Sequence, residues 1–168
     1  MHTKYPRMVD HQQRALAIVR IAVGLLFLSA LLAKLNPDFV PTFYKALQPF
    51  IKSTPYAFYK DFLAQTVVPA HMAFAYLVLI VELVVGVGLV LGLFTAPLAL
   101  LGAVLALNYY FAAAGLGFAT GALALLLVVV LVALALGYAG TTWGVDRHLV
   151  GRTPYWFQGL IHYEYREF

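Results

Sequence analysis

Residues 72–94 read MAFAYLVLIVELVVGVGLVLGLF, an apolar run that one charged side chain, Glu82, interrupts near its middle. An α-helix rises about 1.5 Å per residue, so about 20 residues cross the roughly 30 Å of hydrocarbon in a bilayer. A helix is the structure that lets such a run satisfy its backbone hydrogen bonds inside the bilayer. The run therefore predicts a transmembrane helix that carries a carboxylate at mid-depth.

Three further apolar runs accompany it, at 15–35, 97–114 and 119–138. The first contains Arg20 and, near its end, Lys34, and the other two carry no charge. Of the 168 residues, 63% are hydrophobic and 11% are charged, whereas a soluble domain is roughly half apolar and about a quarter charged. The sequence predicts an all-α integral membrane four-helix bundle, a single domain over 1–150, with a short cytoplasmic tail at 151–168.

The connections between these runs differ in length. Two are tight turns at 95–97 and 115–118, so the last three helices are expected to be antiparallel neighbours. The first connection, 36–70, is long, and apolar residues repeat in it at helical spacing opposite polar ones. It predicts an amphipathic helical insert of two short helices, which either lie at the membrane interface or cap the bundle. The apolar positions of the first are Phe39, Phe43, Leu47, Phe50 and Ile51.

The net charge of +4 reports orientation rather than a nucleic-acid partner. Lysine and arginine are enriched on the cytoplasmic side of membrane proteins. An arrangement with the N-terminus inside places seven of the eleven basic residues on or near the cytoplasmic side, and four lysines on the other side. We therefore expect a multi-pass protein of the plasma (inner) membrane, embedded in its lipid bilayer, with both termini cytoplasmic and no nucleic-acid partner.

Glu82 is the strongest candidate for a functional residue. A carboxylate at this depth costs about 2.5 kcal/mol or more unless it is paired, protonated or facing a polar cavity. Two interpretations stay open, a proton carrier and a buried polar tie between helices. Asn108 lies at the same depth in the third helix, and a hydrogen bond between the two side chains would contribute about 0.6 to 2 kcal/mol.

Arg20 is the candidate counter-charge for Glu82. It lies about 7.5 Å inside its helix, and helical side chains lean toward the N-terminus. Two alternatives follow: an ion pair with Glu82, or a side chain that snorkels to the cytoplasm. A single helical stripe turns both cations of this helix toward the bundle; it consists of Arg20, Gly24, Phe27, Leu31 and Lys34.

Two further residues have alternative interpretations. His71 lies three turns before Glu82 on the same helical face, where it is either part of a proton path from the outside or a hydrogen-bonded anchor at the interface. Tyr109, with its neighbour Tyr110, either lines a pocket for a flat ring such as a quinone or packs between helices.

The residue types present also exclude several redox centres. The chain has no cysteine, which excludes disulfides, Fe–S clusters and thiolate metal sites. A bis-histidine haem needs two histidines at matching depth, and the histidines other than His71 lie outside the apolar runs. The sequence carries no metal-binding motif. We therefore expect no haem, Fe–S cluster or metal.

Several stretches match a known pattern. They are RIAVGLLFL at 20–28 with AKL at 33–35, ELVVGVGLVLGLFT at 82–95, and WGVDR at 143–147. Together they resemble the DoxX/DoxD family of small membrane proteins, over about residues 15–150. The stretch of Asn108, Tyr109 and Tyr110 is more similar to the DoxD branch, which is associated with thiosulfate:quinone oxidoreductase.

The resemblance implies a subunit of a quinone-linked membrane oxidoreductase, with a partner membrane or soluble subunit. Quinone would be the cofactor, bound near Glu82, Asn108 and Tyr109, and Glu82 would carry the proton that its reduction requires. Arg20 and His71 would belong to the surrounding polar network. The alternative is a non-catalytic scaffold or assembly subunit of a larger membrane complex, in which Glu82 only ties helices together.

The predicted topology can be tested with single cysteines, because the natural chain has none. A cysteine at Lys45 and a cysteine at Arg152 should react with a membrane-impermeant thiol reagent from opposite faces of the membrane, with Lys45 outside. Reaction of both from one face would contradict the four-helix arrangement. Reaction from reversed sides would contradict only the orientation.

Overall fold

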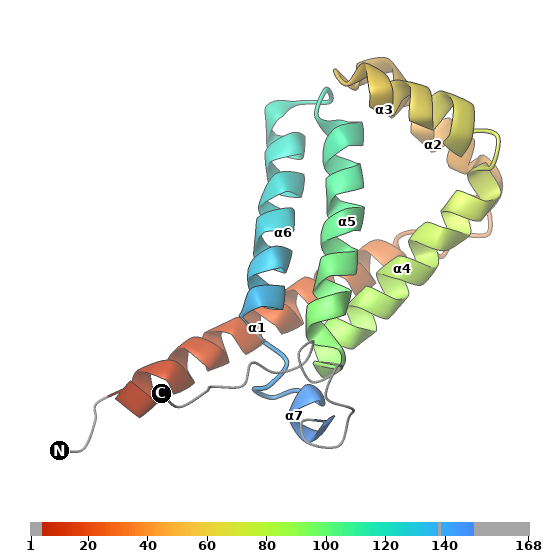
Figure 1. Cartoon of the computed structure of the whole chain (residues 1–168). Coiled ribbons are helices and arrows are strands. Elements are labelled where there is room, and N and C mark those ends of the chain that lie inside the picture. Colours follow the sequence, from red (N-terminus) through yellow and green to blue (C-terminus); the bar gives the residue numbers. More distant parts are fainter. Residues whose placement is uncertain (1–4, 138, 150–168) are drawn as a thin grey trace.

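The computed structural model describes residues 5–137 and 139–149, which form helices joined by turns, with no strand among them (Figure 1). Four of these helices are long and apolar enough to cross a membrane, and this confirms the predicted fold class. They are α1 (Tyr5–Leu32), α4 (His71–Leu91), α5 (Thr95–Ala113) and α6 (Phe118–Leu136). The predicted tail at 151–168 lies outside the described residues.

Two helix ends differ from the predicted bounds for identifiable reasons. α1 begins at Tyr5 rather than at 15, because apolarity marks the part of a helix that lies in the bilayer and not the whole helix. Its apolar span is His11–Leu32. α4 ends at Leu91 rather than at 94, because Gly92 adopts a left-handed conformation with φ 64°, which terminates a helix and favours glycine.

The insert between α1 and α4 forms three short helical segments, α2 (Phe39–Ser53), α3 (Ala57–Phe62) and the π-helix η1 (Leu63–Val67), which we call the cap. Of the two predicted alternatives, the structure shows the one that caps the bundle. Leu47 of α2 is buried, together with Tyr59 of α3 and Ala112 of α5. The amphipathic pattern of α2 thus reflects packing of its apolar face against the membrane-spanning helices.

The cap is fastened to one end of α5. The hydroxyl of Thr54, between α2 and α3, donates a hydrogen bond to the carbonyl of Phe111 at 2.7 Å. Gly115, in the turn after α5, lies against the backbone of Ser53 so closely that a Cβ at this position would overlap the Ser53 carbonyl. Only glycine allows this contact between the cap and the α5–α6 turn.

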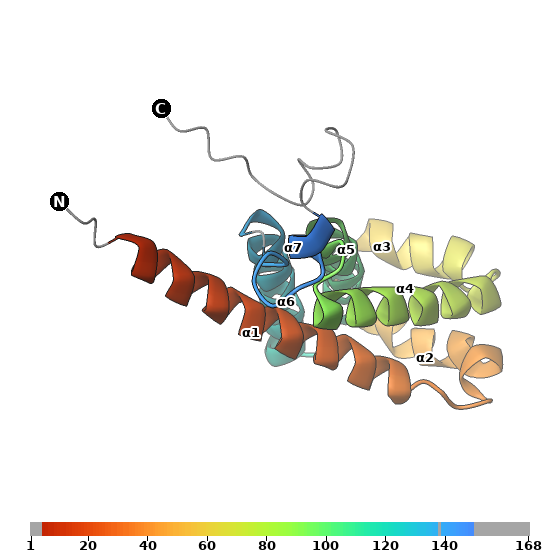
Figure 2. The same cartoon turned by 90° about the horizontal axis from the view of Figure 1, so that it is seen from below.

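The membrane-spanning helices form a wedge. α5 and α6 pack side by side, whereas α4 diverges from α5 away from their shared turn, and the cap fills the open end (Figure 1). α1 runs alongside α4 in the opposite direction (Figure 2). The cap and the short helix α7 (Asp146–Leu149) lie at opposite ends of the α5–α6 pair (Figure 1).

α1 and α4 approach each other at two glycines. A Cβ on Gly24 would lie 2.8 Å from the backbone nitrogen of Val90 and 2.9 Å from the carbonyl oxygen of Gly86. A Cβ on Gly86 would lie 3.2 Å from the carbonyl oxygen of Gly24. The two backbones are therefore in direct contact, as small residues permit between membrane helices.

A polar cluster around Arg20 and Asp146 closes the narrow end of the wedge. Arg20 is fully buried and donates hydrogen bonds to the carbonyls of Ala139 at 2.8 Å and Trp143 at 3.0 Å. Asp146 accepts hydrogen bonds from the backbone N–H groups of Phe94 at 2.7 Å and Thr95 at 2.9 Å. Its carboxylate thus caps the N-terminus of α5 and holds the α4–α5 turn to the segment after α6.

The glycine contact between α1 and α4 predicts an unequal effect of two alanine substitutions. Gly24→Ala should lower the free energy of unfolding by about 1 to 3 kcal/mol, because the added methyl group meets backbone atoms that cannot move independently. Gly121→Ala in α6 is the matched control, since a Cβ there makes only ordinary contacts of 3.4 Å or more. Thermal unfolding in detergent measures both, and equal melting temperatures would contradict the close approach.

Candidate functional site

Glu82 lies in the middle of α4 and is 1% exposed. Its carboxylate faces the ammonium group of Lys34, whose Nζ lies 2.8 Å from Oε1 and 3.1 Å from Oε2. The hydroxyl of Tyr109 on α5 donates a third hydrogen bond to Oε1 at 3.1 Å. The buried carboxylate is therefore paired with a cation and hydrogen-bonded, which are conditions for an ionised group to remain inside a membrane protein.

Lys34 connects this buried group to the surface. Its side chain is 23% exposed, just beyond the end of α1. Besides the two contacts with Glu82, Nζ donates to the carbonyl of Ala30 at 3.1 Å. An ammonium group has three N–H donors, so each of them has an acceptor.

The arrangement follows from the sequence of α1. The predicted stripe does face the bundle: Arg20, Gly24, Phe27 and Leu31 are buried, and Lys34 continues it. Because Gly24 lets α1 touch α4 near Gly86, the two antiparallel helices bring Lys34 beside Glu82. The glycine contact and the ion pair are thus two consequences of one helix packing.

Arg20 is not the partner of Glu82. It lies 14 residues before Lys34 on α1, which corresponds to about 21 Å along the helix. Its guanidinium donates hydrogen bonds to backbone carbonyls of the segment after α6. The apolar pattern of the sequence could not predict these partners, because they are more than 100 residues away along the chain. Of the two cations on the stripe, Lys34 is the counter-charge.

Asn108 also makes contacts other than the expected one with Glu82. Its Oδ1 accepts a hydrogen bond from the hydroxyl of Tyr59 at 3.2 Å, and its Nδ2 donates to the carbonyl of Val104 at 2.8 Å. One residue along a helix rotates the side chain by about 100°. Asn108 was predicted as a partner because of its depth in the helix, but the face of α5 that is turned toward Glu82 carries the next residue, Tyr109.

His71 lies at the beginning of α4, in contact with the cap. Its Nδ1 donates to the carbonyl of Val68 at 3.1 Å, and its ring packs edge-on against Tyr44 with 5.3 Å between the ring centroids. Eleven residues, about 16 Å of helix, separate it from Glu82. These contacts are those of an anchor between α4 and the cap.

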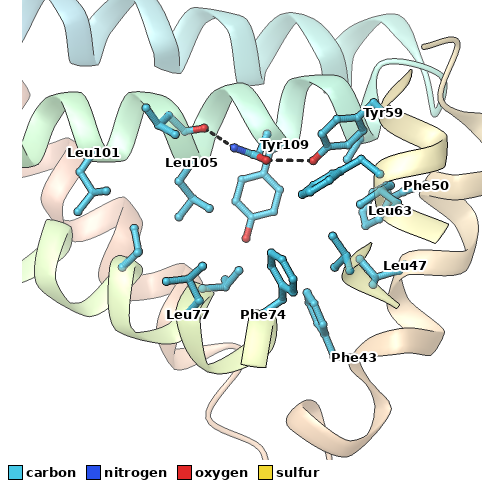
Figure 3. Close-up of a pocket in the computed structure, with 17 residues that line it drawn as sticks. Phe43, Leu47, Phe50, Tyr59, Leu63, Phe74, Leu77, Leu101, Leu105 and Tyr109 are labelled. Atoms are coloured by element: carbon cyan, nitrogen blue, oxygen red, sulfur yellow. Dashed lines mark hydrogen bonds between the residues drawn. The ribbon is translucent and has the colours of Figure 1, made fainter. Parts of the chain in front are cut away.

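A cavity of about 260 Å³ lies between α4, α5 and the cap (Figure 3). Its wall is predominantly apolar, with side chains from the cap such as Phe43 and from α4 such as Leu77. Tyr109, Asn108 and Tyr59 supply its polar groups. Figure 3 shows the ring of Tyr109 projecting between the apolar side chains of the two walls.

Tyr59, in the cap, remains a hydrogen-bond donor at physiological pH. Burial raises its pKa to about 12, because removal from water disfavours the charged phenolate. The protonated hydroxyl can therefore hold the Asn108 amide in place at the cavity wall throughout the neutral range.

These groups form a polar chain that leads from the surface to the cavity. Lys34 is partly exposed, Glu82 is buried, and Tyr109 belongs to the cavity wall. Hydrogen-bonded groups of this kind can pass a proton between an ionisable carboxylate and a ligand oxygen. The sequence identified Glu82 and Tyr109, whereas the pairing with Lys34 and the contribution of the cap to the cavity required the structure.

Fold and site together define a small multi-pass helical membrane protein with a ligand-sized apolar cavity next to a buried ion pair. The family model described as DoxX matches residues 15–115, more than half of the chain, and the protein belongs to the DoxX family. The matched segment includes Lys34, Glu82 and Tyr109. No curated protein and no solved structure matches the chain.

The ion pair predicts strong coupling between Lys34 and Glu82. Lys34→Met should destabilise the protein by about 3 to 5 kcal/mol, because it leaves a buried carboxylate without its cation. Glu82→Gln should cost less, since the partly exposed ammonium of Lys34 can turn toward water. The double variant should be more stable than the sum of the single changes predicts.

Arg20 supplies the control for this double-mutant cycle, measured by unfolding in detergent. The effects of Arg20→Gln and Glu82→Gln should add, because the two side chains share no contact. Coupling of Glu82 to Arg20 rather than to Lys34 would show that the assigned ion pair is wrong.

Proposed function

We propose that this DoxX family protein is a subunit of a quinone-linked membrane oxidoreductase, similar to thiosulfate:quinone oxidoreductase. The observation that carries this proposal is the position of Tyr109, which lines the cavity and whose hydroxyl donates a hydrogen bond to Glu82. We place the chain in the plasma membrane with both termini in the cytoplasm, so that Lys34 and the cap lie on the outer side.

The cavity suits a substituted ring in size and in chemistry. A cavity of about 150 Å³ is large enough to bind benzene, so about 260 Å³ accommodates a ring with substituents. Ligand sites of this kind combine mainly apolar walls with a few polar groups that fix orientation. Asn108 can donate to or accept from a ring oxygen and Tyr109 can accept from a ring hydroxyl, while Phe43, Leu77 and Leu105 would contact the ring and its tail.

A quinone supplies, when bound, the two-electron redox chemistry that these side chains do not have. Tyr109 would relay a proton: as protonated Glu82 gives its proton to the Tyr109 oxygen, Tyr109 gives its own proton to a ring oxygen, and the reverse order returns a proton to Glu82. Glu82 holds that proton or releases it, and Lys34 balances its negative charge and connects it to water at the surface. Because the chain has no cysteine, we propose that electrons come directly from a substrate or from a partner subunit.

A non-catalytic scaffold is the second candidate, and one observation favours it. Every N–H donor of Lys34 has an acceptor, two of them on Glu82, so the ion pair also ties α1 to α4. In a scaffold this tie would be the whole role of Glu82, and the apolar outer faces of the helices would contact partner subunits.

Gentle purification followed by lipid extraction tests the two functions. The oxidoreductase proposal predicts about one quinone per chain, in its oxidised or its reduced form. Leu105→Trp, which fills the cavity, should lower the quinone content severalfold, whereas Leu107→Trp on the exposed face of α5 should leave it unchanged. The melting temperature of each variant verifies that it is folded.

The outcome that would contradict the proposal is equally concrete. Wild-type protein that carries no quinone and does not take up added quinone, but copurifies with a stoichiometric protein partner, would favour the scaffold.

A further inference from the structure

The Glu82 carboxylate is the acceptor in each of its side-chain hydrogen bonds described above. Lys34 and Tyr109 donate, and the ionised carboxylate can only accept. A phenol has one O–H, so the single proton of Tyr109 is directed to Glu82. What Tyr109 offers to the cavity is a lone pair.

Tyr109 does not readily turn this proton toward a ligand. Hydrogen bonds to an ionised acceptor are roughly twice as strong as those between neutral groups. Turning the hydroxyl away would also remove a donor from a carboxylate that is 1% exposed. The Lys34 ammonium beside the same carboxylate is a donor only, so Glu82 is the acceptor to which the Tyr109 proton is directed.

The second phenol on the wall is oriented in the same way. The hydroxyl of Tyr59 donates its hydrogen bond to Oδ1 of Asn108, so Tyr59 also presents a lone pair to the cavity. The Asn108 amide donates one N–H to the carbonyl of Val104 and accepts from Tyr59 on one lone pair of Oδ1. It retains one N–H and one lone pair, and therefore does not by itself favour a donor or an acceptor. The polarity of the wall is set by the two tyrosines.

We propose that the cavity selects the hydroxyl-bearing, reduced form of an aromatic ring ligand over its carbonyl form, and that Tyr109 determines this specificity. A ring hydroxyl donates to the free lone pair of Tyr109, whereas a carbonyl or ether oxygen faces it without a proton between them. The inference rests on the proposed function, in that the cavity binds a ring.

The selectivity has a consequence for the redox couple. Tenfold tighter binding of the hydroxyl form would raise the two-electron midpoint potential of the bound couple by about 30 mV. The site would then stabilise the ligand after it has been reduced, with its oxygen atoms protonated.

A pair of redox-inert probes tests the inference without turnover. 4-Pentylphenol and 4-pentylanisole differ in whether the ring oxygen carries a proton, and calorimetric titration of the full chain in detergent gives both dissociation constants. Wild-type protein should bind the phenol roughly five- to tenfold more tightly, the effect of one hydrogen bond. Tyr109→Phe should abolish the preference, because phenylalanine has no lone pair to offer.

Two further variants keep the test decisive. Tyr110→Phe is the matched control, since Tyr110 bonds Tyr56 and does not line the cavity, and it should retain the wild-type preference. Glu82→Gln should reduce the preference, because a glutamine can donate to Tyr109 and release its proton toward the ligand. This variant also serves if Tyr109→Phe fails to fold.

The possible failures are distinguishable. Equal binding of phenol and anisole by wild-type protein would overturn the selectivity and leave ring binding intact. A preference that persists in both Tyr109→Phe and Glu82→Gln would overturn the assignment to Tyr109. Binding of neither probe would overturn ring binding, and with it the proposed function.

Discussion

A carboxylate between membrane-spanning helices is costly unless it is paired, protonated or in contact with polar groups. The packing around Glu82 supplies a cation at 2.8 Å and a hydroxyl donor at 3.1 Å. The cation arrives because α1 lies against α4 with backbone contact at Gly24, which brings the end of α1 beside the middle of α4. The donor arrives because α5 turns Tyr109, and not its neighbour Asn108, toward α4. Displacing either helix by one side-chain diameter would leave Glu82 charged and unpartnered, which is why this interaction constrains three helices at once.

The two polar clusters explain the shape of the molecule. Asp146 fastens the α4–α5 turn to the segment after α6, and Arg20 fastens α1 to the same segment, so the helices are held together at that end. α4 and α5 diverge toward the other end, where Glu82 joins α4 to α1 through Lys34 and to α5 through the long side chain of Tyr109. The resulting wedge is filled by the cap, whose anchoring through Thr54 places aromatic side chains opposite α5. The cavity is the space that remains between these three walls.

The sequence was sufficient for the features that depend on apolar length and helical period. Four apolar runs predicted four spans, the period of 39–51 predicted the cap helix, and the lone charge in 72–94 identified Glu82. It was insufficient for the choice of partners, for two physical reasons. Arg20 and Lys34 lie on the same helical stripe, and which of them contacts Glu82 depends on how α1 crosses α4. It also depends on backbone carbonyls after α6, distant in sequence, that accept hydrogen bonds from Arg20. α5 is apolar on every side, so its sequence does not reveal which face, Asn108 or Tyr109, turns toward α4.

The charged groups of the site, Lys34 and Glu82, do not line the cavity, and Tyr109 lies between Glu82 and the cavity. Glu82 stands behind Tyr109, and the side chains that line the cavity are neutral. An uncharged ligand could therefore occupy the cavity without desolvating an ion, because Glu82 is already paired with Lys34 outside the wall. Among the described residues that line the cavity, Tyr109 is the one that bonds the ion pair, and its hydroxyl would transmit the state of Glu82 to a ligand as the direction of one hydrogen bond. A carboxylate placed directly in the wall would have to lose its hydration or its ion pair when an apolar ring of the proposed kind entered, and the position of Glu82 behind Tyr109 avoids that cost.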